Sequence, residues 1–248
     1  MRLLILGGSD SSGEHLPNFA DSWRERLREE LPALLGEEVE VFHRKYYTYV
    51  PGPLDYLERC LADAGPDFVI LGANGWEFAT PSVANRLRRL FGKTAGDWFE
   101  RRFESFDAAT LGHEGRLRRG INRGGHAVAG LIGREPTASY ESVLQTYLRT
   151  IDRLARQEDL DVIVMGTTYL APELHARLPK MRSRIIRFNA ALRAEAERRH
   201  FGWLDKAGLV EAQGRAGLLD PLHRSAATHR VMADAFKAMI TERAGARA

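Results

Sequence analysis

Three short segments combine residue types that could carry out acyl transfer. They are Gly7-Gly8-Ser9-Asp10-Ser11-Ser12-Gly13, Gly72-Ala73-Asn74-Gly75 and Asp220-Pro221-Leu222-His223. Ser9 could act as a nucleophile on a tight turn, His223 could take up its proton, and Asp220 could orient the imidazole through the other ring nitrogen. The side-chain amide of Asn74 and the backbone N–H of Ser9 could stabilise the oxyanion of a tetrahedral intermediate.

These segments lie at the ends of predicted elements in an alternating pattern. Short apolar strands are expected at residues 2–6, 39–42, 67–71, 161–165 and 202–204. Helices are expected at residues 19–35, 54–64, 81–91, 140–156, 182–199 and 225–243. Strands that alternate with helices indicate an α/β protein with a parallel sheet and right-handed crossovers. Sites in such sheets lie at the carboxyl ends of the strands, which is where residues 7–13 and 72–75 fall.

The same segments resemble sequence blocks of the SGNH (GDSL) hydrolases. The glycine loop resembles the first block, Gly-Asp-Ser-x-Thr-x-Gly, with Ser9 at the nucleophile position and Ser11 in place of the threonine. Residues 72–75 resemble the third block, Gly-x-Asn-Asp, and residues 220–223 resemble the fifth, Asp-x-x-His. The order of these blocks, and their positions beside predicted strands and helices, carry the resemblance further than any one block does.

The resemblance implies a three-layer α/β/α, flavodoxin-like fold with a five-stranded parallel sheet. It implies hydrolysis of a carboxylic ester or thioester through an acyl-enzyme on Ser9, with His223 and Asp220 completing the triad and Asn74 in the oxyanion hole. It also implies that a glycine N–H joins the oxyanion hole, for which Gly52 is the candidate. No metal or cofactor is implied, and the expected partner is a small-molecule ester.

Two residues depart from the family pattern. Gly8 replaces the aspartate beside the nucleophile, and Gly75 replaces the aspartate after Asn74. Neither departure removes a triad member, but both remove side chains that could brace the loops. A non-catalytic relative is therefore one alternative. Another is a Rossmann-like nucleotide-binding protein that uses the glycine loop at residues 7–13, although the G-x-G-x-x-G spacing is absent.

The chain is predicted to form a single domain over residues 1–248. A mainly helical insertion or lid is expected at about residues 82–138, where the family resemblance is interrupted by a glycine- and arginine-rich stretch. One interpretation of this stretch is a solvated surface insertion. The other is a lid that contacts an anionic part of the substrate or a partner.

Composition excludes several classes of protein. No apolar run approaches the roughly 18 residues of a membrane span, and the net charge of +3 is too small to indicate nucleic acid as the main partner. A single cysteine, Cys60, excludes an internal disulfide and a cysteine-ligated zinc site. The amino-terminal residues do not resemble a secretory signal, so a cytoplasmic location is expected. The oligomeric state is left open.

Overall fold

The computed structural model describes residues 1–8, 11, 13, 16–49, 52–79, 138–168, 181–219 and 223–246. The chain divides into two compact units, one of residues 1–75 with 141–248 and one of residues 76–140. In the second unit a short helix, α4 (Trp76–Ala79), is described, and Glu77 O accepts a hydrogen bond of 2.9 Å from Ala138 N. The helix expected at 81–91 and all but the last residue of the expected insertion lie outside the described residues.

The first unit is built on a five-stranded sheet. The strands are β1 (Arg2–Gly7), β2 (Glu40–Lys45), β3 (Phe68–Gly72), β4 (Asp161–Met165) and β5 (Gly202–Leu204). Their order is β2-β1-β3-β4-β5, and every neighbouring pair is parallel. This is the flavodoxin-like order, and it confirms the expected fold class.

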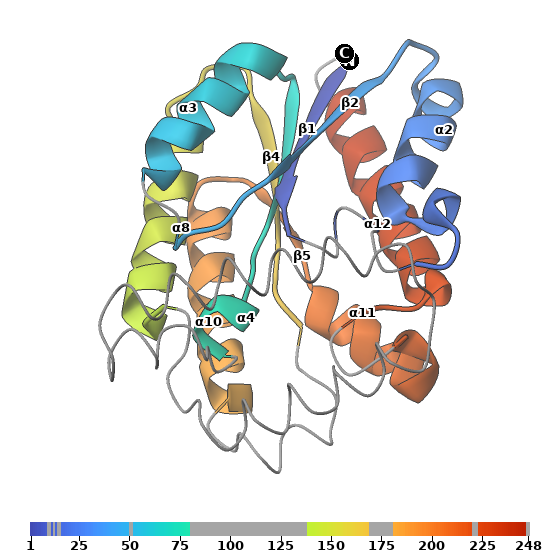
Figure 1. Ribbon diagram of the computed structural model, residues 1–248. Coiled ribbons are helices and arrows are strands. Elements are labelled where there is room, and N and C mark those ends of the chain that lie inside the picture. Colours follow the sequence, from blue (N-terminus) through green and yellow to red (C-terminus); the bar gives the residue numbers. More distant parts are fainter. Residues whose placement is uncertain are drawn as a thin grey trace, which may run out of the picture. The chain divides into compact units, whose positions relative to one another are not determined.

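Helices cover both faces of this sheet. They are α2 (Trp23–Leu35), α3 (Pro53–Ala64), α8 (Tyr140–Leu154), α10 (Met181–Arg198), α11 (Lys206–Gln213) and α12 (Ala226–Gly245), with short 3-10 turns at Phe19–Asp21 and Gly214–Gly217. Figure 1 shows α3, α8 and α10 on one side of the sheet, and α2 and α12 on the other. The three-layer arrangement is therefore as expected.

Local capping explains two differences from the sequence expectation. The helix expected from residue 19 begins later, because the Ser22 side chain accepts a hydrogen bond from Glu25 N and caps α2. The helix α11 was not expected. It begins after Asp205, whose side chain accepts a hydrogen bond from Gly208 N.

The core follows the alternation of side chains along the strands. On the face covered by α2 and α12, Leu3 and Ile5 of β1 pack with Trp23 and Phe236, and the two aromatic rings lie 4.8 Å apart. On the other face, Tyr147 of α8 meets Phe188 of α10 edge to face, with 5.7 Å between ring centroids. Both faces are closed by apolar packing, which fixes the strand ends that carry the predicted site.

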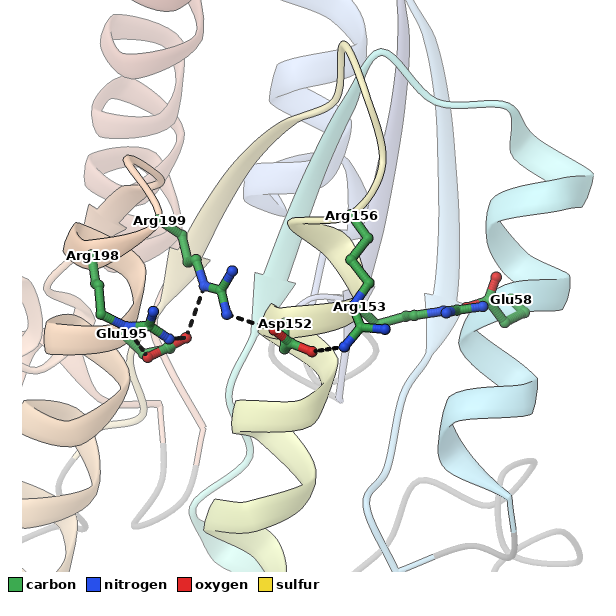
Figure 2. Close-up of polar contacts among 7 residues, drawn as sticks. All are labelled: Glu58, Asp152, Arg153, Arg156, Glu195, Arg198 and Arg199. Carbon is green, nitrogen blue, oxygen red and sulfur yellow. Dashed lines mark hydrogen bonds and ion pairs between the residues drawn. The ribbon is translucent and has the colours of Figure 1, made fainter.

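A chain of ion pairs joins the three helices on the second face (Figure 2). Arg153 of α8 pairs with Glu58 of α3. Asp152 of α8 accepts from Arg156 at 2.6 Å and from Arg199, just after α10, at 2.5 Å. Arg199 also reaches Glu195 at 3.1 Å. Four of these six side chains are more than a third exposed, so the ion pairs tune stability and do not dominate it.

The network predicts a loss of stability in acid. The hydrogen bond from Arg156, together with nearby Arg199, lowers the pKa of Asp152. Burial raises the pKa of Glu195, but hydrogen bonds from Arg198 and Arg199 outweigh it, so the net pKa is lowered. Because both pKa values are lower in the folded chain than in the unfolded one, the stabilisation is complete above pH of about 5 and is lost as pH falls further.

Thermal denaturation between pH 7 and pH 3 tests this expectation. The melting temperature of Asp152→Asn should fall less steeply with acid than that of the native chain. Glu38→Gln, which changes an exposed carboxylate outside the network, should follow the native curve. If Asp152→Asn follows it equally closely, the network does not contribute.

Candidate active site

The sheet order places two of the predicted loops at the topological switch point. The chain leaves β1 toward one edge of the sheet and leaves β3 toward the other, and in sheets of this kind ligands bind at such a point. Gly8 follows β1, and a Cβ added to it would lie only 2.6 Å from Asn74 Oδ1, after β3. The Asn74 side chain therefore lies against the residue that precedes Ser9. Ser9 and Asp220 themselves lie outside the described residues.

Asn74 is held rigidly in this position. The residue is 9% exposed, its backbone N–H donates to Tyr147 Oη at 2.9 Å, and its Nδ2 donates to the Tyr46 carbonyl at 2.8 Å. The Tyr147 hydroxyl donates in turn to Gly72 O at 3.4 Å. Because an amide nitrogen carries two hydrogens, one remains for which the described residues supply no acceptor. Such a fixed donor suits an oxyanion hole.

The glycine loop has a second internal brace in Ser11. This residue is 1% exposed, and its Oγ donates to the Gly8 carbonyl at 2.7 Å. The same Oγ lies 3.2 Å from His43 Nε2, so the imidazole is the donor in that contact. A buried hydroxyl that is already engaged holds the loop and is not available as a nucleophile. Sequence analysis did not single out His43, although its position near the carboxyl end of β2 was a usable signal.

The turn after Asn74 is tied to the loop after β4. Gly75 N donates to Thr167 Oγ1 at 3.0 Å. Asn189 of α10 clamps the same threonine, accepting from Thr167 N at 3.0 Å and donating to Thr167 O at 2.8 Å. A Cβ on Gly75 would lie 2.6 Å from Thr167 Cγ2, so an aspartate at this position would not fit without movement. Sequence analysis did not identify Thr167.

His223 lies in a hairpin-like segment just before α12. Its carbonyl accepts from Leu219 N at 2.9 Å, and Leu218 and Arg224 form an antiparallel bridge. The Ser225 side chain caps α12 by accepting a hydrogen bond from Thr228 N. Arg224 donates to Thr168 Oγ1, which brings the segment that contains His223 to the loop after β4.

Gly52 stands apart from these contacts. It precedes α3 in a left-handed conformation, with φ 64° and ψ 48°, and its carbonyl accepts from Tyr56 N at 3.0 Å. The described hydrogen bonds join Asn74, Gly75, Thr167 and Arg224 to one another's loops, but they do not include Gly52. Its predicted role in the oxyanion hole stays a prediction.

The described part of the chain lacks two further features. No group of three or more His, Cys, Asp or Glu side chains there could hold a metal ion. No helix in these ranges is long and apolar enough to cross a membrane.

Comparison with known proteins gives a match in structure alone. No protein-family model and no curated protein matches the sequence significantly. A lipase/acylhydrolase from Enterococcus faecalis superimposes with a TM-score of 0.61 at 14% identity, over 98% of this chain and 97% of that one. The acetylxylan esterase Axe2 from Geobacillus stearothermophilus gives 0.56 at 14% identity, over 94% and 91%. TesA gives 0.54 at 14% identity, over 97% of each chain. This chain therefore shares the fold of these three proteins, as the SGNH resemblance implied.

The close approach of Asn74 to Gly8 leads to a prediction about the stability of a Gly8 variant. Gly8 has backbone dihedrals open to any residue, so Gly8→Ala adds no backbone strain but forces a methyl group against a clamped amide. We expect the free energy of unfolding in urea to fall by about 1–3 kcal/mol. The control is Gly245→Ala, where an added Cβ meets nothing within 4 Å. Equal stability of the two variants would show that Asn74 yields freely.

Proposed function

We propose that this chain hydrolyses carboxylic esters or thioesters through an acyl-enzyme on Ser9. The observation that carries the proposal is the position of the Asn74 amide against Gly8, the residue before Ser9, at the switch point of the sheet. The side chain of Asn74 thus lies next to the loop that contains Ser9, and its Nδ2 retains one N–H that could serve an oxyanion hole. The esterases and acylhydrolases that share this fold support the same chemistry.

The proposed reaction runs in two halves. Ser9 Oγ attacks the ester carbonyl carbon while His223 takes the hydroxyl proton, and the carbonyl oxygen becomes an oxyanion. When the tetrahedral intermediate collapses, His223 returns the proton to the departing alkoxide or thiolate, which leaves the acyl group on Ser9. Water then attacks the acyl-enzyme in the same way and releases the carboxylic acid. Asp220 holds the imidazole in the required tautomer throughout.

The proposed oxyanion hole consists of the Asn74 amide, the Ser9 N–H and the Gly52 N–H. For Asn74, rigidity is the main supporting argument. Hydrogen bonds to Tyr147 and Tyr46 set the position of its backbone and side chain before substrate arrives, so little reorganisation is needed as charge develops. A glycine at position 8 suits this arrangement, because a larger residue there would collide with the side-chain amide of Asn74. The departure from the family pattern is thus compatible with catalysis.

Turnover of 4-nitrophenyl acetate and butyrate, without added metal or cofactor, tests the proposal. Ser9→Ala should lower kcat by about 1,000-fold or more, and Asn74→Ala by about 100- to 1,000-fold. Ser12→Ala, the same substitution three residues along the loop, should stay within about threefold of the native rate because it changes no proposed catalytic group.

Two outcomes would count against the proposal. Ester hydrolysis that survives in Ser9→Ala at the native rate would remove Ser9 from the mechanism. A native protein that hydrolyses neither ester, and whose glycine loop instead binds a dinucleotide, would favour the nucleotide-binding alternative.

A further inference from the structure

Arg224 is a buried cation whose donors are mostly unused. The residue is 3% exposed, and its Nη2 donates to Thr168 Oγ1. Its Nε and Nη1 are buried without a hydrogen-bond partner. These two atoms carry three of the five N–H hydrogens of a guanidinium. No carboxylate in the described part of the chain pairs with Arg224, so the positive charge is uncompensated there.

Two partly buried arginines elsewhere in the described residues are paired with carboxylates. Arg243 pairs with Asp161 at 2.8 Å and also donates to the His200 carbonyl at 3.0 Å. Arg26, which has one unpartnered nitrogen, still pairs with Asp21 at 3.1 Å. A buried charge without a counterion is costly to folding, and an apolar side chain of similar volume would fill the same space without that cost. The cost points to a ligand that supplies the missing negative charge.

Arg224 is connected to the candidate active site both along the chain and through hydrogen bonds. It follows His223 directly in the chain and stands two residues before the first residue of α12, whose amino-terminal end favours anions. Its partner Thr168 follows Thr167, which receives the hydrogen bond from Gly75, next to Asn74. Arg224 is therefore one residue from the proposed base and is linked through two threonines to the proposed oxyanion hole.

We propose that Arg224 binds an anionic group of the substrate, so that the preferred esters carry a carboxylate or a phosphate. This inference rests on the proposed function, because it assigns substrate class to the same site. The guanidinium offers charge-assisted hydrogen bonds to two or more anionic oxygens, and burial strengthens them. Arg224 is a specificity-determining residue and takes no part in proton transfer.

A pair of nearly isosteric esters tests the inference. Mono-4-nitrophenyl succinate ends in a carboxylate where 4-nitrophenyl butyrate ends in a methyl group. The native protein should prefer the succinate. Arg224→Met should lower kcat/KM for the succinate at least about tenfold more than kcat/KM for the butyrate, so that the preference between the two esters is lost. Arg224→Lys, which keeps the charge, should fall between the two. Competitive inhibition of butyrate hydrolysis by free succinate and by inorganic phosphate then distinguishes a carboxylate from a phosphate as the preferred group.

Thermal denaturation provides a readout that does not need activity. Arg224→Met should melt no lower than the native protein, because it removes an uncompensated buried charge. Succinate or inorganic phosphate should raise the melting temperature of the native chain and not that of the variant. Arg224→Met that melts several degrees lower would show that the guanidinium is structural and would overturn the inference.

The two proposals can fail separately. Ser9-dependent hydrolysis with the same succinate-to-butyrate preference in the native chain and Arg224→Met leaves the proposed function in place and overturns the role of Arg224. An inactive native chain that is still stabilised by succinate or phosphate through Arg224 removes the hydrolase proposal and keeps the anion site.

Discussion

Asn74 is held beside Gly8 by two hydrogen bonds, one from its backbone N–H to the Tyr147 hydroxyl and one from its side-chain Nδ2 to the Tyr46 carbonyl. These donors and acceptors come from α8 and from the end of β2, so two separate parts of the sheet assembly fix one amide. This constraint explains why Gly8 cannot carry the aspartate of the family pattern without movement, while Thr167 occupies the corresponding space at Gly75. The rest of the candidate site is arranged around this fixed point.

From Asn74 a line of contacts runs across the carboxyl end of the sheet. Gly75 bonds to Thr167, Asn189 clamps that threonine, and neighbouring Thr168 receives Arg224. Hydrogen bonds therefore connect the loop after β3 to the loop after β4, and the loop after β4 to the segment before α12. The last residue of this line, Arg224, is a buried guanidinium with unused hydrogen-bond donors. The proposed preference for anionic esters rests on these donors.

Much of the fold could be predicted from the sequence because buried parallel strands have a distinctive pattern. The strands at Asp161–Met165 and Gly202–Leu204 have the predicted bounds, since each is flanked by turn residues. The roles of Thr167 and Arg224 could not be predicted, because they depend on contacts between distant segments. Arginine is ordinarily an exposed residue, so the burial of Arg224 could be known only from the structure.

Covalent labelling with a fluorophosphonate tests the central claim most directly, because it reports the nucleophile without assuming a substrate. The account predicts one adduct per chain, located by peptide mass spectrometry on Ser9, that disappears in Ser9→Ala and is strongly slowed in His223→Ala. An adduct on another serine, or no adduct on a folded native protein, would contradict the assignment of Ser9 as an activated nucleophile.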